Sequence, residues 1–220
     1  MKNLISILSL FIWTNPVYSS VIISDVTGAD MVGIEVTANF AGGGSETVTW
    51  LSTSSDNSIP FDEGYAGGVV GSGWSLSQQG NTFGDITPGG QLLGLWTLTN
   101  NSGSALSTLV IDALVADFAF DTIDSVEGTL GSNVGRPFVT GFAGAFGTYS
   151  DLFSSPDLYG TLTLDWGQTN FASGNSMTFM ADTDSIPEPA TVLLLGAGLL
   201  GMAGARVRAK KQHASMKNEV

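Results

Sequence analysis

The residue types that carry most enzyme chemistry are missing from the central part of this 220-residue chain. The chain has no cysteine, its only histidine is His213, and no lysine lies between Lys2 and Lys210. Residues 20–185 therefore hold no Ser-His or Cys-His nucleophile pair, no Schiff-base lysine and no histidine-ligated zinc or copper. We expect this part of the chain to be non-catalytic.

Carboxylates are the reactive groups that remain. Residues 20–185 contain eighteen Asp and Glu. A glycosidase needs two carboxylates about 5–9.5 Å apart, and eighteen candidates make some pair at that separation almost unavoidable by chance. The acids alone therefore do not identify a catalytic pair.

Two pairs of aspartates could bind calcium. Asp182 and Asp184 lie two residues apart and precede Ser185, while Asp121 and Asp124 form a second pair. Calcium takes about six to eight oxygen ligands, and neither pair belongs to a twelve-residue loop with a distal glutamate. We predict a calcium site at Asp182 and Asp184, with turn-capping aspartates as the alternative, and expect no other cofactor.

Four tryptophans give an alternative function, a carbohydrate-binding module or carbohydrate-active enzyme. Indole rings stack on sugar rings, but they fill the core of a β-sandwich equally well. Two of them exposed in one groove would favour sugar binding, whereas burial of all four would remove this hypothesis. They are Trp50, Trp74, Trp96 and Trp166.

The elements that must position these residues are strands. Apolar and polar residues alternate with a period of two in residues 32–40, 158–166 and 177–181, and no stretch before the C-terminal region has helical spacing. We predict hairpins at residues 30–52 and, around Asn100 to Gly103, between strands 91–99 and 106–118. Residues 57–82 are predicted as a long loop with a short strand at 73–77. The fold class is all-β, an antiparallel β-sandwich.

The C-terminal region has a different pattern. Pro187, Glu188 and Pro189 should stay extended, because proline disfavours helical angles in the preceding residue. The apolar run 190–205 would form a helix of roughly 24 Å, a little short of a membrane span. Its basic end places the C-terminus in the cytoplasm. The basic residues are Arg206, Arg208, Lys210 and Lys211.

These three features, in this order, resemble the PEP-CTERM sorting signal of bacteria. The resemblance covers residues 186–211 and leaves 212–220 as a cytoplasmic tail. It implies recognition by the membrane protease exosortase, cleavage near the Pro-Glu-Pro tripeptide, and passage of the released domain to the cell surface or extracellular polysaccharide. Other segments also resemble ectodomains that recur with this signal: residues 30–50, 74–77, 80–83, 96–100, 157–162 and 179–185. An ordinary single-pass anchor is the alternative.

The N-terminus predicts the same topology. Residues 1–19 combine Lys2, an apolar stretch and small residues before Ser20, which is typical of a secretory signal peptide. Residues 20–185 are left as one exported domain, with Arg136 as its only basic residue and a formal net charge of −17. Such a surface repels nucleic acid and anionic membranes.

Overall fold

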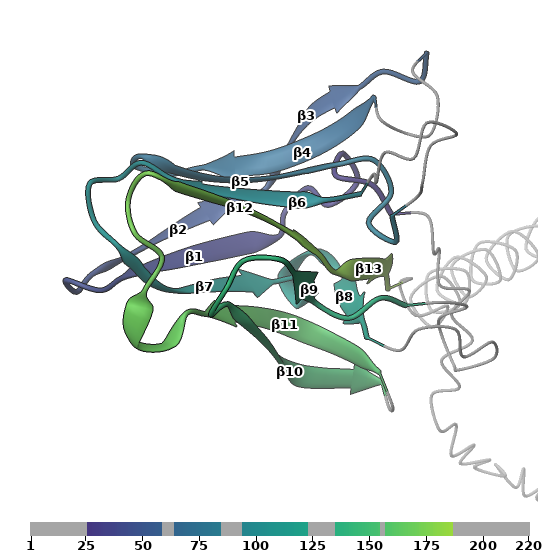
Figure 1. The fold of residues 1–220 in the computed structure, drawn as a ribbon. Coiled ribbons are helices and arrows are strands. Elements are labelled where there is room, and N and C mark those ends of the chain that lie inside the picture. The colour runs from purple at the N-terminus through teal and green to yellow at the C-terminus, as the bar shows by residue number, and fades with distance from the viewer. Residues whose placement is uncertain (1–25, 59–63, 85–93, 123–134, 155–156, 187–220) are drawn as a thin grey trace, which may run out of the picture. The chain divides into compact units, whose positions relative to one another are not determined.

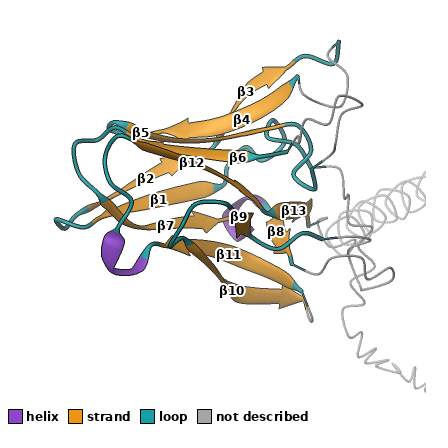
Figure 2. Cartoon of the chain, viewed as in Figure 1, coloured by secondary structure: helices purple, strands orange, loops and turns teal. Residues whose placement is uncertain are grey.

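The computed structural model describes residues 26–58, 64–84, 94–122, 135–154 and 157–186, all within one compact unit, Val21–Glu188. Regular structure in these ranges is β-strand apart from two single-turn 3-10 helices, η2 Leu114–Ala116 and η3 Gly167–Thr169 (Figure 2). The strands are β1 Glu35–Phe40, β2 Ser45–Thr49, β3 Leu51–Ser55, β4 Tyr65–Val70, β5 Trp74–Gln79, β6 Trp96–Asn100, β7 Leu106–Asp112, β8 Phe118–Asp121, β9 Val139–Thr140, β10 Phe146–Ser154, β11 Leu158–Asp165, β12 Asn175–Met180 and β13 Asp182–Ser185.

The strands form two antiparallel sheets, which Figure 1 shows as two layers. The first sheet has the order β13-β8-β11-β7-β1-β2, and β10 also pairs with β11. The second sheet has the order β3-β4-β5-β6-β12-β9. The predicted all-β, antiparallel fold is confirmed. The predicted signal peptide, residues 1–19, and the predicted membrane helix, residues 190–205, lie outside the described residues.

Among the residues that the structure describes, no helix is both long enough and apolar enough to cross a membrane.

One hydrophobic core lies between the two sheets. In the first sheet, Val36 of β1 lies opposite Ile111 of β7, which lies opposite Leu162 of β11, and all three side chains are fully buried. Their neighbours along each strand, such as Thr37, point to the other face. The alternation of apolar and polar residues in the sequence therefore indicates that each strand has one buried face. The second sheet contributes Val69, Leu76, Leu98, Met177 and Phe179 to the same core.

Aromatic rings fill the centre of this core. The Trp96 ring lies 5.7 Å from Phe179 in a stacked arrangement and 5.2 Å from Trp50 in an edge-on arrangement, between ring centroids. Trp50 follows β2 of the first sheet and precedes β3 of the second, so it lies where the chain passes between sheets. Both indole nitrogens donate to backbone carbonyls, Trp50 to Gly28 at 2.8 Å and Trp96 to Ala181 at 2.9 Å.

The first predicted hairpin is confirmed, and the second is wrong. β1 and β2 pair from Glu35 opposite Thr49 onward. β6 and β7, in contrast, lie in different sheets, and the residues between them form a crossing. The Asn100 amide nitrogen holds this crossing by donating to the carbonyls of Ser104 at 2.8 Å and Phe171 at 2.9 Å. Asn, Ser and Gly identify a turn correctly, but they do not show whether the flanking strands pair.

The predicted strand at 106–118 also ends earlier, because η2 separates β7 from β8. The predicted loop at 57–82 contains a complete hairpin of β4 and β5. β4 has no alternating pattern, since it carries consecutive glycines at 67 and 68. A Cβ at Gly67 would overlap the Gly28 carbonyl and the Trp50 indole nitrogen, so close packing requires glycine there.

Replacing Trp96 with alanine should lower the free energy of unfolding by about 3–5 kcal/mol, because the change removes a buried ring and leaves a cavity. Urea unfolding of the purified protein, followed by circular dichroism, measures this difference. Val70→Ala is the control, because Val70 is 80% exposed and its truncation should change stability by no more than about 0.5 kcal/mol. Similar losses for both variants would contradict a core centred on Trp96.

Candidate functional site

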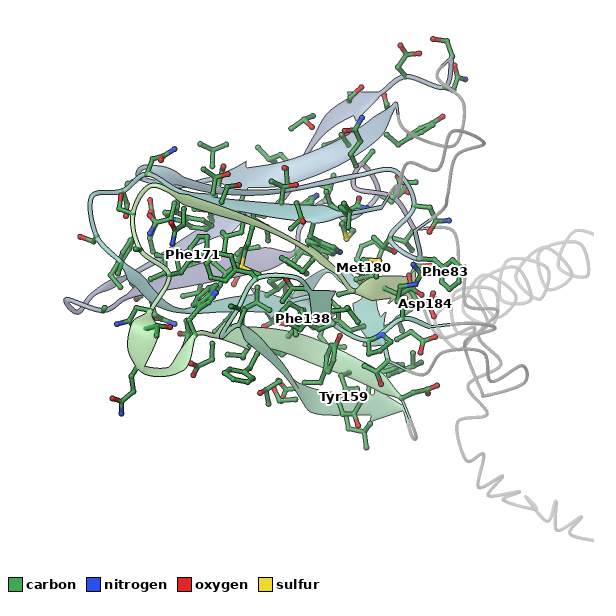
Figure 3. All side chains as sticks on the ribbon, in the orientation of Figure 1. Phe83, Phe138, Tyr159, Phe171, Met180 and Asp184 are labelled. Atoms are coloured by element: carbon green, nitrogen blue, oxygen red, sulfur yellow. The ribbon has the colours of Figure 1, made fainter. Side chains whose placement is uncertain are left out.

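The last described strand, β13, carries the predicted calcium ligands and leads into the Pro-Glu-Pro tripeptide. β13 is an edge of the first sheet and pairs antiparallel with β8, with Asp182 opposite Asp121 and Asp184 opposite Ala119. Asp121, Asp182 and Asp184 are each 0% exposed. Figure 3 labels Asp184 in β13, together with Phe83 and Met180 in the same region. The end of the domain that precedes the motif is therefore a buried acidic cluster.

Asp182 is held by residues distant in sequence. Its Oδ1 accepts hydrogen bonds from the Thr82 hydroxyl at 2.9 Å and from the Thr183 backbone N–H at 2.9 Å. The Thr183 hydroxyl lies 3.1 Å from that of Thr82, and the Thr82 N–H donates to the Val26 carbonyl. Within the described residues, Oδ2 of Asp182 is buried and accepts no hydrogen bond. One carboxylate oxygen is thus satisfied and the other is not.

Burial raises the pKa of Asp182 well above its usual range, and the negative charge of Asp184 raises it further. The hydrogen bonds from Thr82 and Thr183 oppose this shift, while Asp121 adds to it. Burial also raises the pKa of Tyr149 on β10, and Asp182 and Asp121 contribute to that rise. A desolvated carboxyl near two other acids favours its neutral form.

Arg136 is hydrogen-bonded through its backbone to two residues of this acidic cluster. Its backbone N–H donates to the Asp121 carbonyl at 3.1 Å, and its carbonyl accepts from the Asp182 N–H at 3.0 Å. Its guanidinium lies 4.5 Å above the Phe83 ring and donates to the Met180 sulfur at 3.4 Å. The backbone of Arg136 therefore extends the pairing of β8 and β13, while its positive charge is directed to an aromatic ring and a sulfur.

The structure brings some of the predicted calcium ligands together. Asp182 and Asp184 lie two apart on β13, and Asp121 from the second predicted pair lies directly opposite Asp182. Asp124 lies outside the described residues. Among the residues that are described, no group of three or more His, Cys, Asp or Glu is arranged to hold a metal ion. Calcium binding at Asp182 and Asp184 stays a prediction.

The tryptophans do not offer stacking faces for sugars. Trp50 and Trp96 are 0% exposed, Trp166 is 1% and Trp74 is 2%. Trp74 donates its indole N–H to Glu46 Oε2 at 2.7 Å, and Trp166 stacks on Phe171 with centroids 5.0 Å apart. All four indole rings are buried in the core, so the alternative hypothesis of a sugar-binding site built on them is wrong.

The domain ends close to the Pro-Glu-Pro tripeptide. The Ile186 N–H donates to the Asp117 carbonyl at 2.6 Å, one residue beyond β13. The next residue is Pro187, which has no N–H to continue a β-ladder. The tripeptide and the basic residues lie outside the described residues: Pro187, Glu188, Pro189, Arg206, Arg208, Lys210 and Lys211.

Comparison with known protein families assigns this last segment. A PEP-CTERM protein-sorting motif matches residues 185–209. The chain carries a PEP-CTERM sorting motif. The match includes Pro187, Glu188, Pro189 and two of the basic residues, Arg206 and Arg208. Neither the curated proteins nor the solved structures give a match to this chain.

The PEP-CTERM motif identifies exosortase as the processing partner and directs the chain to the cell surface or extracellular space. The matched region begins at Ser185, which is also the last residue of β13. The sorting signal thus follows the fold without an intervening linker. The contact of Thr82 with Asp182 was not predicted, because no local pattern joins residues a hundred positions apart.

The raised pKa of Asp182 predicts that the protein loses stability as the pH rises. The folded state binds a proton on Asp182 more tightly than the unfolded chain, whose Asp pKa is about 3.9. This contribution is fully present below that value and is lost as the pH rises through the folded-state pKa. Melting temperatures of the purified protein from pH 5 to pH 8 measure it.

Asp182→Asn should raise the melting temperature at the upper end of this range and flatten the pH profile, since Asn keeps the hydrogen-bonding oxygen without the charge. Asp56→Asn is the control, because hydrogen bonds from Ser58 lower the pKa of that exposed carboxyl. It should leave the slope between pH 5 and pH 8 unchanged, because a lowered carboxyl pKa changes stability only below the ordinary Asp pKa of about 3.9. An unchanged profile for Asp182→Asn would contradict a neutral Asp182 in the folded protein.

Calcium binding predicts a separate effect. A specific ion adds RT ln(1 + [L]/Kd) to stability, about 2.7 kcal/mol at a hundredfold excess over Kd, whereas screening acts equally in matched salts. The melting temperature should be higher in millimolar calcium chloride than in sodium chloride of equal ionic strength. Asp182→Asn combined with Asp184→Asn should remove the difference. Equal melting of the wild-type protein in both salts would refute the calcium site.

Proposed function

We propose that this chain is a non-catalytic structural component of the extracellular matrix, released by exosortase and associated with exopolysaccharide. The observation that carries this proposal is the coincidence of the last strand with the start of the sorting motif at Ser185. Cleavage near Pro187-Glu188-Pro189 would leave β13 paired with β8. The released product would keep the whole described fold.

The composition of the domain supports a role without catalysis. Between residues 20 and 185 the chain has no cysteine, histidine or lysine and one arginine, Arg136. Asp182 is fully buried and bound to Thr82, so it is directed into the fold. A structural role for the acidic cluster fits this placement better than contact with a substrate.

The outer face of the first sheet supports contact with a hydroxyl-rich polymer. Three rows of side chains cross β2, β1, β7, β11 and β10 in register. The central row joins Thr37 to Thr47 by a hydroxyl–hydroxyl contact of 2.7 Å, and the next row joins Asn39 to Thr108 at 2.8 Å. The central row contains Thr47, Thr37, Val110, Thr163 and Thr148, and the flanking rows contain Thr49, Glu35, Asp112, Thr161 and Ser150, and Ser45, Asn39, Thr108, Asp165 and Phe146.

This face supplies donors and acceptors at regular spacing, about 4.8 Å between strands. Its charged members are all acidic: Glu35, Asp112 and Asp165. Like the domain as a whole, the face should therefore repel anionic polymers and tolerate neutral or cationic ones. We propose that the exopolysaccharide it contacts is not strongly anionic.

Before release, residues 190–205 would form a transient helix in the inner membrane. Residues 1–19 would have been removed as the signal peptide during export. Arg206, Arg208, Lys210 and Lys211 would hold the C-terminus on the cytoplasmic side, because basic residues are retained there. Residues 212–220 would be the cytoplasmic tail.

Exosortase processing predicts that the extracellular form lacks residues 192–220. Mass spectrometry of protein recovered from the medium and from the polysaccharide fraction defines its C-terminus and location. Pro187→Ala combined with Glu188→Ala should leave the chain uncut and associated with the membrane. Recovery of the released form with the polysaccharide tests the matrix association separately.

Pro137→Ala is a matched control, because it replaces a proline within the folded domain and should leave processing unchanged. An extracellular protein that still contains residues 192–220 would refute processing at this motif. A correctly cut protein found only in the soluble medium would refute the association with polysaccharide while leaving the sorting assignment intact.

A further inference from the structure

β10 is the longest described strand and forms an open edge of the first sheet. It pairs with β11 from Phe146 opposite Asp165 to Ser154 opposite Leu158. β11 uses its other edge for β8 and β7. Within the described ranges, no strand pairs with the outer edge of β10 (Figure 1). Alternate residues of such an edge direct backbone N–H and C=O groups away from the sheet.

Apart from Asp151, the exposed side chains of β10 are apolar or uncharged. Phe146 is 62% exposed and Leu152 is 54% exposed, with Thr148 and Ser150 exposed between them. The inner side is closed, since Gly147 lies against the Phe138 ring and the Tyr149 hydroxyl accepts from the Phe138 N–H at 2.7 Å. The strand is thus fixed from within, and its outward side chains from Phe146 to Ser150 carry no charge.

β10 has few of the features that protect edge strands. Such strands are commonly short or carry lysine or proline, and β10 has nine residues and neither of these. The other edges are shorter: β2 and β3 have five residues each, β13 has four and β9 has two. One protective feature is present, a left-handed Asp151 and a register shift after Leu152. The regular pairing surface is therefore Phe146 to Ser150.

The negative charge of the domain and the lack of charge on β10 indicate that a second copy of the chain would bind at this edge. Residues 20–185 carry a net charge of −17, so most faces of two copies repel one another. Phe146 to Ser150 contains no charged residue. Antiparallel pairing of a strand with its own copy is two-fold symmetric, so the same residues supply both sides of the contact. The edge strand β3 is also uncharged, but its register shifts between Ser52 and Ser54. β10 therefore presents the longer regular run without charge, where two acidic copies can meet with least repulsion.

We propose that β10 is a self-association site, at which two copies of the chain pair antiparallel through Phe146 to Ser150. The first sheets of the two copies would then form one continuous sheet. The contact is small, so we expect a weak dimer with a Kd on the order of 10–100 µM. Added salt should strengthen it, because screening reduces repulsion between the acidic domains.

Sedimentation of the exported protein over a range of concentrations tests the dimer. Thr148→Lys places a charge in the centre of the edge and should raise Kd at least about tenfold. Thr47→Lys is the matched control, because it makes the same substitution on β2, an exposed edge of the same sheet. It should leave Kd within about twofold of the wild-type value.

Hydrogen exchange on the unmodified protein gives a second measurement that does not depend on the folding of a variant. Amides of residues 146–150 should gain protection as the protein concentration rises, while those of β2 should not. A wild-type protein that stays monomeric up to about 1 mM would overturn the proposal. So would equal weakening by the two lysine variants, or protection confined to other strands.

Discussion

The packing of aromatic rings around Trp96 is the interaction on which the rest of the structure depends. The chain has no cysteine, so no disulfide joins the two sheets. Trp96 of the second sheet contacts Phe120 of the first, with centroids 6.3 Å apart, as well as Trp50 and Phe179. Trp50 occupies the crossing between sheets. An exported protein without disulfides must obtain its stability from such packing.

The same core fixes the end of the domain. Phe120 lies opposite Thr183, so the strand that contributes a ring to the core also pairs with β13. The Ala181 carbonyl, which accepts from the Trp96 indole, immediately precedes β13. Asp182 and Asp184 are fully buried on this strand, and Thr82 donates a hydrogen bond to Asp182. The core therefore fixes the last strand before the PEP-CTERM motif.

The outer surfaces have a different organisation from the core. Hydroxyl, amide and carboxylate groups form registered rows on the first sheet, while apolar exposure on that sheet is concentrated at the ends of β10. Under the proposed self-association, negative charge would keep copies of the domain apart on most faces, and the uncharged edge of β10 would be where they meet. If both proposals hold, the domain would contact polymer on one face and another copy at an edge, an arrangement that builds an extended matrix.

The sequence by itself determined the features that depend on local pattern or on composition. The period of two in residues 32–40 and 158–166 identified strands, and the order of Pro187-Glu188-Pro189, apolar run and basic residues identified the sorting motif. Only the tertiary structure decided that β6 and β7 separate into two sheets and that all four tryptophans are buried. It also decided that Thr82 binds Asp182. Turn residues set the local backbone angles, but the choice of sheet and the surroundings of a side chain depend on contacts between residues far apart in the chain.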